Sequence, residues 1–352
     1  MMGSDMRYGA LSAKVHALYG KRLRAAEFAA LAERKDPAEI LEALRHHPGW
    51  SRGLAQAAPE GWSYVGRVEV ERALWGELEL EYLSLTHYVP REDRELMQFL
   101  VRLAERSAIL SALRDLRAGR PSGAEEHIPA LLRQSRVDAA ALARCASYDQ
   151  MLDAVKGSIY YPALHHLRPR PGEALPDYTI AECVLRTAYF SHMYRIAQRQ
   201  YGGAVQKVLL RAMGEQVDLL NIIRILRLKT YFPDTPQEEY LAVLSPFHYR
   251  LKPELTRRLC TAPDAAAVFR LLEGTPYRDS FRGVEVLDVE EYYRRALYLF
   301  NRHQLVTGPA SVYTAMAYLD LKETEMTVLI NVIESVKYAV PYHAPMAELV
   351  GG

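Results

Sequence analysis

The chain has 352 residues, of which 49% are hydrophobic, so it can bury the core of one or more domains of ordinary size. Its 44 basic and 43 acidic side chains give a net charge of +1, which excludes a global field that would steer the protein to nucleic acid or to an anionic membrane. Three scattered cysteines exclude a disulfide framework and a zinc ribbon, and their odd number fits a reducing compartment.

The sequence contains no segment with the apolar length of a membrane span. Residues 1–8 lack the apolar stretch of a signal peptide, and no apolar run approaches the roughly 18 to 20 residues that a bilayer requires. We therefore expect that any membrane contact runs through a partner.

The predicted elements are helices, because helix-forming residues and a period of 3.6 dominate. Residues 64–70 alternate only in part and suit either a short strand or the lead-in to a helix. Residues 71–85 then carry the buried stripe of an amphipathic helix, formed by Leu74, Leu78, Tyr82 and Leu85. Residues 205–228 are apolar almost all round, which predicts a long and deeply buried helix. The sequence therefore predicts an all-α fold.

An approximate apolar pattern recurs three times along the chain, with a spacing of about 110 residues. Each copy has one leucine, then an apolar pair, then a further apolar residue, at identical offsets. The copies are Leu31, Ile40-Leu41 and Leu44; Leu142, Met151-Leu152 and Val155; and Leu259, Val268-Phe269 and Leu272. The pattern predicts three helical repeat units, residues 1–120, 121–232 and 233–352. The alternative, that an all-α chain offers matching residues by chance, stays open.

Two long helices are expected to follow the short helical pair in each unit. On the first of them an acid precedes an apolar residue by two turns, as in Glu71 with Leu78, Glu182 with Tyr189 and Glu291 with Tyr298. On the second, residues 105–114 align with 218–227 and more loosely with 325–334. This alignment places Glu105, Asp218 and Glu325 at equivalent positions.

Four motifs, in this order and spacing, resemble the C subunit of prokaryotic V-type ATPases, whose eukaryotic counterpart is the d subunit. The opening helix has Tyr8, Ala10-Leu11, Ala13-Lys14-Val15 and Leu23, and the next element is residues 36–41. The other two motifs are the stretch from Asp218 to Lys229 and the segment Lys322-Glu323-Thr324-Glu325, which is expected to open the last long helix. The resemblance covers residues 7–350, but Ala108 and Val328 stand where the family pattern would repeat Asn221.

The resemblance implies three similar helical domains that form a funnel around a pseudo-threefold axis. It further implies a monomeric rotor subunit in the central stalk, on the cytoplasmic face of the membrane. There the funnel would hold the central shaft subunits on one side and contact the proteolipid ring on the other. ATP hydrolysis or synthesis would thereby be linked to H⁺ or Na⁺ transport, with no catalytic site, no cofactor and no nucleic acid involved. A generic helical scaffold is the competing hypothesis, and a helical metal-dependent enzyme is a more distant one.

Candidate polar residues lie on the second long helices. Asp218, Asn221, Arg224 and Arg227 follow one another at steps of three, so each is a neighbour of the next on a helix. They suit two roles, an intramolecular network that fixes the repeats or the polar lining of the shaft socket. Glu105, Arg114 and Glu325 are the corresponding candidates in the other units.

Signals for catalysis or metal binding are weak. The phosphate-binding pattern G-x-x-x-x-G-K-[ST] does not occur. The pairs His46-His47 and His165-His166 point about 100° apart on a helix and cannot easily share an ion. The carboxylate pairs Glu323 with Glu325 and Glu290 with Glu291 are expected on solvated faces or at helix starts. We therefore expect no metal site and no catalytic site.

Overall fold

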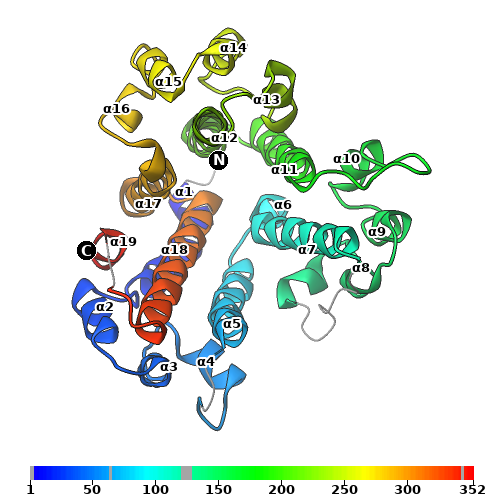
Figure 1. Ribbon diagram of the computed structural model, residues 1–352. Coiled ribbons are helices and arrows are strands. Elements are labelled where there is room, and N and C mark those ends of the chain that lie inside the picture. The colour runs from blue at the N-terminus through cyan, green and yellow to red at the C-terminus, as the bar shows by residue number, and fades with distance from the viewer. Residues whose placement is uncertain (1–3, 63–65, 120–128, 342–344) are drawn as a thin grey trace. The chain divides into compact units, whose positions relative to one another are not determined.

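A computed structural model describes residues 4–62, 66–119, 129–341 and 345–352 (Figure 1). Every regular element in these residues is a helix, which confirms the predicted all-α fold. None of the described helices is both long enough and apolar enough to cross a bilayer. The chain forms two compact units, one of residues 1–97 with 294–352 and one of residues 98–293.

The first unit joins the two ends of the sequence around the long helix α18 (Val312–Lys337). Its other elements are α1 (Ser4–Tyr19), α2 (Ala25–Ala32), α3 (Pro37–Arg45), α4 (Ser51–Ala57), α5 (Arg67–Thr86), η1 (Arg91–Asp93), α6 (Arg94–Met97), α19 (Pro345–Gly351) and most of α17 (Val289–Thr307). Helix α18 packs against α1, α2, α3, α5 and α19, and Figure 1 shows it running beside α5. Because it has neighbours on several sides, α18 is apolar around most of its circumference rather than along one stripe.

Helices α4 and α5 approach each other at Gly53. A Cβ atom at this position would lie 2.5 Å from the backbone nitrogen of Glu77 and 2.6 Å from the carbonyl oxygen of Ala73. Only glycine permits this approach, and its own N–H then donates to the Glu77 carboxylate at 2.7 Å. The absence of a side chain at Gly53 therefore lets the two helices approach closely enough for a buried hydrogen bond between them.

The second unit is continuous in sequence. Its elements are α7 (Phe99–Arg117), η3 (Ala130–Gln134), α8 (Ala139–Arg144), α9 (Tyr148–Ala154), α10 (Tyr161–His166), α11 (Tyr178–Gln200), α12 (Gly203–Tyr231), α13 (Gln237–Val243), α14 (Pro253–Thr261), α15 (Ala265–Leu272), α16 (Arg278–Phe281) and η4 (Val286–Asp288). Its core includes Ile222, Ile225 and Leu226 of α12, packed with apolar residues of α14 and α15.

The long helix predicted over 205–228 is present as α12, but it is deeply buried only in its second half. Lys207 and Arg211 are exposed, whereas the stretch from Ala212 to Leu226 has no exposed residue. The lead-in at 64–70 is helical from Arg67 onward, with residues 63–65 outside the described part of the chain. Local periodicity identified both helices, and their burial depends on neighbours that periodicity does not report.

The start of the last long helix differs from the prediction. The sequence places its opening at Lys322, but α18 begins at Val312, after Ser311, whose hydroxyl and backbone form a capping box with Thr314. Residues 312–319 are all buried. The charged residues at 322–325 are therefore interior to the helix and do not mark its start.

The three copies of the apolar pattern occupy equivalent pairs of short helices. The first leucines lie on α2, α8 and α14, and the apolar pairs that follow lie on α3, α9 and α15. The second helix of each pair begins with an N-cap whose side-chain oxygen accepts a backbone N–H, and these N-caps are Asp36, Ser147 and Asp264. The local structure thus follows the pattern, and the division into three repeats remains a prediction.

The compact units do not end where the predicted repeats end. The predicted boundaries at 120 and 232 come soon after α7 and α12, yet α7 packs against α8 and α9, and α12 packs against α14 and α15. Likewise, α18 packs against α2 and α3. Each second long helix therefore forms a core with the short helices of the next copy of the pattern.

The end of α18 predicts a stabilising substitution. Ala339 has φ 52°, and the N–H groups of Ala339 and Val340 donate to Val336 and Ser335, which is the hydrogen-bond pattern that usually places glycine at this position. Ala339→Gly should raise the free energy of unfolding by about 0.5 to 1 kcal/mol, because glycine adopts positive φ without steric cost. Chemical denaturation measures the change. Ala118→Gly, at the right-handed C-cap of α7, is the matched control and should be neutral or destabilising.

Candidate functional site

The equivalent acids of the second long helices are all buried. Glu105 on α7, Asp218 on α12 and Glu325 on α18 are 0%, 0% and 3% exposed. A carboxylate taken out of water is destabilising by several kcal/mol unless hydrogen bonds and opposite charges replace the lost solvation. The hydrogen-bond donors of each acid therefore show how its charge is compensated and which segments it joins.

Asp218 accepts four hydrogen bonds inside the second unit. The backbone N–H groups of Tyr249, Arg250 and Leu251 donate to it at 3.1, 2.6 and 2.7 Å, and the hydroxyl of Tyr277 donates at 2.6 Å. Residues 249–251 lie directly before α14, and Tyr277 is the N-cap of α16. One carboxylate thus holds two separate segments against α12, and the four donors replace hydrogen bonds that water would otherwise make.

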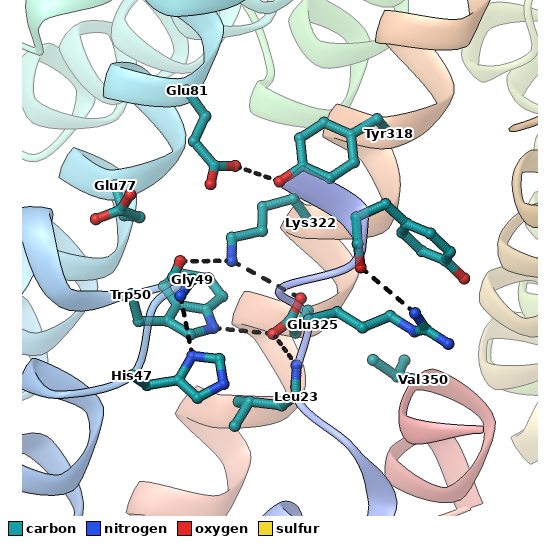
Figure 2. Close-up of polar contacts among 12 residues, drawn as sticks. Leu23, His47, Gly49, Trp50, Glu77, Glu81, Tyr318, Lys322, Glu325 and Val350 are labelled. Carbon is teal, nitrogen blue, oxygen red and sulfur yellow. Dashed lines mark hydrogen bonds and ion pairs between the residues drawn. The ribbon is translucent and has the colours of Figure 1, made fainter. Parts of the chain in front are cut away.

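Glu325 has the corresponding role in the first unit, as Figure 2 shows. The backbone N–H of Leu23, which lies before α2, donates to Oε1 at 3.0 Å. The indole N–H of Trp50, the N-cap of α4, donates to the same oxygen at 2.9 Å. Glu325 was expected on a solvated face or at a helix start, and the structure corrects this prediction because the residue is near the middle of α18.

Lys322 lies beside Glu325 and is also buried. Its Nζ donates to the carbonyl oxygen of Gly49 at 2.8 Å, lies 3.8 Å from Glu325 Oε2 and sits 3.5 Å from the centre of the Trp50 ring (Figure 2). The ammonium group thus balances the buried carboxylate and gains a cation–π contact. The same few residues fix the segment between α3 and α4 against α18.

A second buried carboxylate contact joins α5 to α18. The Tyr318 hydroxyl donates to Glu81 Oε2 at 2.5 Å, and burial raises the pKa of the Glu81 carboxyl above its ordinary value. One turn earlier on α5, Glu77 binds the guanidinium of Arg52 at 2.7 and 3.0 Å. These contacts extend the polar interior of the first unit from α4 to α18.

The buried charge of Glu105 is compensated by a neighbouring arginine. Arg102 donates from one guanidinium nitrogen to both carboxylate oxygens at 2.9 and 3.2 Å, and the hydroxyl of Ser135 donates at 2.7 Å. Ser135 lies before α8 and also caps the N–H of Val137. The Tyr160 hydroxyl, at the N-cap of α10, donates to the carbonyl oxygen of Arg102 at 2.6 Å.

The three arrangements share one plan, and we call each an acid clamp. The first clamp is Glu105 with Ser135, the second is Asp218 with residues 249–251 and Tyr277, and the third is Glu325 with Leu23 and Trp50. In each, a buried acid of a second long helix binds the segment that precedes the next pair of short helices. This geometry favours the inter-repeat interpretation for Glu105, Asp218 and Glu325 over exposure in a socket.

Sequence reasoning missed the aromatic residues in or beside the clamps. Trp50, Tyr160 and Tyr277 each directly precede the third short helix of a copy, and all three are buried. Each follows the last residue of the apolar pattern by five or six positions. An aromatic residue at this position in every copy was a signal that the sequence contained. The repeat was difficult to recognise because the side chain is an indole in one copy and a phenol in the other two.

The remaining candidates on α12 bind within the second unit. Asn221 is buried and pairs with the backbone of Ser245, donating to its carbonyl and accepting from its N–H, both at 3.0 Å. Half-buried Arg224 donates to Glu182 Oε2 at 2.6 Å. Arg227 is exposed and forms an ion pair with Glu290. Arg224 also donates to the carbonyl oxygen of Val243. Asp218, Asn221 and Arg224 therefore all bind the stretch of residues 243–251, whereas Arg227 binds elsewhere.

Arg114 is separated from the clamps. It is exposed on α7, and its guanidinium donates to the Ser111 hydroxyl at 3.2 Å, one turn earlier on the same helix. Arg114 and Arg227, which align in the sequence, are therefore both exposed but bind different partners. Neither arginine is required to satisfy a buried group.

Glu182 on α11 is a partly buried carboxylate that binds two arginines. Burial by itself raises its pKa, but the hydrogen bonds and charges of Arg186 and Arg224 outweigh burial and hold the pKa below its ordinary value. The residue is therefore charged in the folded protein at neutral pH. It joins α11 to α12 through Arg224.

No cluster of histidine, cysteine, aspartate or glutamate suited to a metal ion occurs among the described residues. His46 lies 3.3 Å from Glu42, whereas the ring of His47 accepts the N–H of Gly49 at 3.1 Å. The two neighbouring histidines therefore have different partners. Burial lowers the pKa of His47 below its ordinary value, which favours the neutral ring.

Comparison with protein families decides the identity at the family level. The family model described as ATP synthase (C/AC39) subunit matches residues 11–347. The chain belongs to this family. A C/AC39 chain is a subunit of a V-type rotary ATPase, as the sequence resemblance predicted. No curated protein sequence matches the chain significantly. The matched range includes all residues of the three acid clamps of this C/AC39 chain.

The second clamp of the C/AC39 chain can be tested by removing one donor. Tyr277→Phe removes the hydroxyl from Asp218 and should lower the free energy of unfolding by about 2 kcal/mol, because the lost bond is to a buried charge. Urea denaturation measures the change. Tyr178→Phe is the control, since Tyr178 is exposed at the start of α11, and it should change stability by less than about 0.5 kcal/mol. Equal effects of the two substitutions would contradict the clamp.

Glu182 predicts a pH dependence of stability. Its pKa in the folded C/AC39 chain lies below the ordinary value of 4.5, so its contribution is present above that pH and is lost as pH falls through the lower folded value. The stability difference between the wild type and Glu182→Gln should therefore be largest near neutral pH and shrink under acid conditions. Denaturation curves at several pH values measure it. Glu71→Gln, at the equivalent position on α5, is the control and should show a smaller dependence.

Proposed function

We propose that the chain is a non-catalytic rotor subunit of the central stalk, a socket that couples the central shaft to the proteolipid ring. In this role it links ATP hydrolysis or synthesis to H⁺ or Na⁺ transport. The observation that carries the proposal is the family match over residues 11–347, nearly the whole chain. The predicted funnel of three helical repeats, monomeric and bound to the cytoplasmic face of the membrane through the complex, belongs to the same proposal.

The acid clamps support this role through stiffness. A part that transmits torque must not let its helices slide when load is applied. Each clamp fixes the middle of a long helix to a neighbouring segment through short, buried hydrogen bonds, such as the 2.6 Å and 2.7 Å bonds to Asp218 from Arg250 and Leu251. Opening a clamp would leave a buried carboxylate without its donors, which is strongly destabilising.

The placement of the arginines refines where a socket is to be sought. Arg224 is engaged with Glu182, and Arg227 with Glu290. Of the two, exposed Arg227 is the better candidate for a contact with the shaft, because its intramolecular pair is solvent-exposed and weak. Arg224 supports the α11–α12 pair instead.

Reconstitution separates coupling from catalysis. Complexes assembled with and without the chain should both hydrolyse ATP in their peripheral heads, but only the complete complex should acidify or load vesicles with the transported ion. Adding the purified chain should restore most of the transport, whereas the isolated chain should show no ATP turnover. Ion transport of normal rate in complexes without the chain would contradict the proposed role.

A further inference from the structure

The segment from the end of α12 into α13 exposes large apolar side chains. Tyr231, Phe232 and Leu241 are 52%, 64% and 51% exposed. Single exposed apolar residues are common, but three within so short a segment form a contact surface that water solvates poorly. Such a segment is stabilised when another molecule covers it.

The segment holds its aromatic residues on an ordered turn. The N–H of Phe232 donates to Leu228 at 2.8 Å, and both the N–H and the hydroxyl of Thr235 donate to the Phe232 carbonyl, at 3.1 and 2.7 Å. The neighbouring Tyr240 points inward, fully buried, with Lys229 Nζ 4.5 Å from its ring centre. A fixed turn loses little conformational entropy when it binds.

The charges of the segment are of one sign. Asp234, Glu238 and Glu239 are exposed, and residues 230–247 contain no lysine, arginine or histidine. Lys229, which immediately precedes this stretch in the sequence, is directed onto the Tyr240 ring. We name the set Tyr231, Phe232, Asp234, Glu238, Glu239 and Leu241 the α12–α13 surface.

The described residues at the equivalent helix ends have different chemistry. At the end of α18, Tyr338 is exposed, but its neighbours are Lys337, 5.8 Å from the ring centre, and the pair of Arg67 with Glu334. At the end of α7, Arg117 donates to the carbonyls of Leu175 and Pro176. Among the described residues at these three helix ends, three acids beside exposed aromatics occur only at the end of α12.

We propose that the α12–α13 surface is a docking site for a protein partner that presents a basic surface with apolar side chains at its centre. Charge decides between this partner and a lipid surface. Exposed aromatic residues also suit a membrane interface, but the negative cytoplasmic leaflet would repel three carboxylates and attract lysine or arginine. Opposite charge on a protein partner instead speeds association and fixes its orientation. This inference requires only a basic partner and does not depend on the coupling role.

A photo-cross-linking residue tests the surface in the full chain. We would place p-benzoylphenylalanine at position 232 in cells that contain the native partners, and at position 178 as the control, because Tyr178 is an exposed tyrosine of the same unit. Mass spectrometry of the irradiated product identifies the cross-linked peptide. The expected result is a protein adduct at position 232, absent at 178, whose cross-linked segment has a net positive charge.

Neutralising the acids tests the electrostatic part. Asp234→Asn, Glu238→Gln and Glu239→Gln together should lower the adduct yield by about tenfold. Amides are preferred to lysines because lysine in the first turn of α13 would oppose the helix dipole. If the triple variant loses thermal stability, irradiation of the chain with p-benzoylphenylalanine at position 232 in cell lysate at rising salt concentration gives the same information, since the adduct yield should fall as charges are screened.

Several results would overturn the proposal. They are an adduct with lipid, an adduct with a second copy of this chain, an adduct with a segment that carries no net positive charge, and a yield at position 232 no higher than at position 178. A yield that is insensitive both to the triple substitution and to salt would also overturn it. Cross-linking to a basic protein outside the rotary complex would support the docking site and leave the coupling role to be judged by reconstitution.

Discussion

The buried carboxylate is the interaction on which the rest of the structure depends. Glu105, Asp218 and Glu325 each bring a charge into a protein interior, and each is compensated by a different set of donors. Asp218 uses backbone N–H groups and a phenol, Glu105 uses an arginine, and Glu325 uses an indole with a nearby lysine. Each acid also has at least one donor from a segment 30 or more residues away, Ser135 in the case of Glu105, so satisfying the acid brings distant segments together.

Much of the fold could be predicted from the sequence because local residue patterns determine where the helices form. The anchors at Leu142 and Met151-Leu152 identified two short helices that the structure places at α8 and α9. The alignment of Glu105, Asp218 and Glu325 brought together three residues that later proved to be equivalent in burial. Helical periodicity and internal similarity are read directly from the order of residues, so they can be recognised without knowledge of the tertiary structure.

The partners of those residues could not be predicted, since they depend on contacts between distant segments. Nothing near Glu325 in the sequence indicates Trp50 or Leu23, and the charged run at 322–325 favoured a solvated helix start instead. The polar stripe from Asp218 to Arg227 on α12 was similarly ambiguous. A step of three residues places each side chain beside the next on the helix, but it does not determine which other segment each side chain binds. Burial of a charge is visible only when its donors are in place.

The arrangement of the first unit has a consequence for biosynthesis. The second unit is one continuous stretch, so its core can form while the chain is still being made. The first unit cannot, because the N–H of Leu23 and the indole of Trp50 bind Glu325, and about 300 residues separate these partners. Until α18 leaves the ribosome, the amino-terminal helices have no core to complete. The nascent chain therefore carries them as an incomplete core, accessible to chaperones, while about 300 further residues are synthesised.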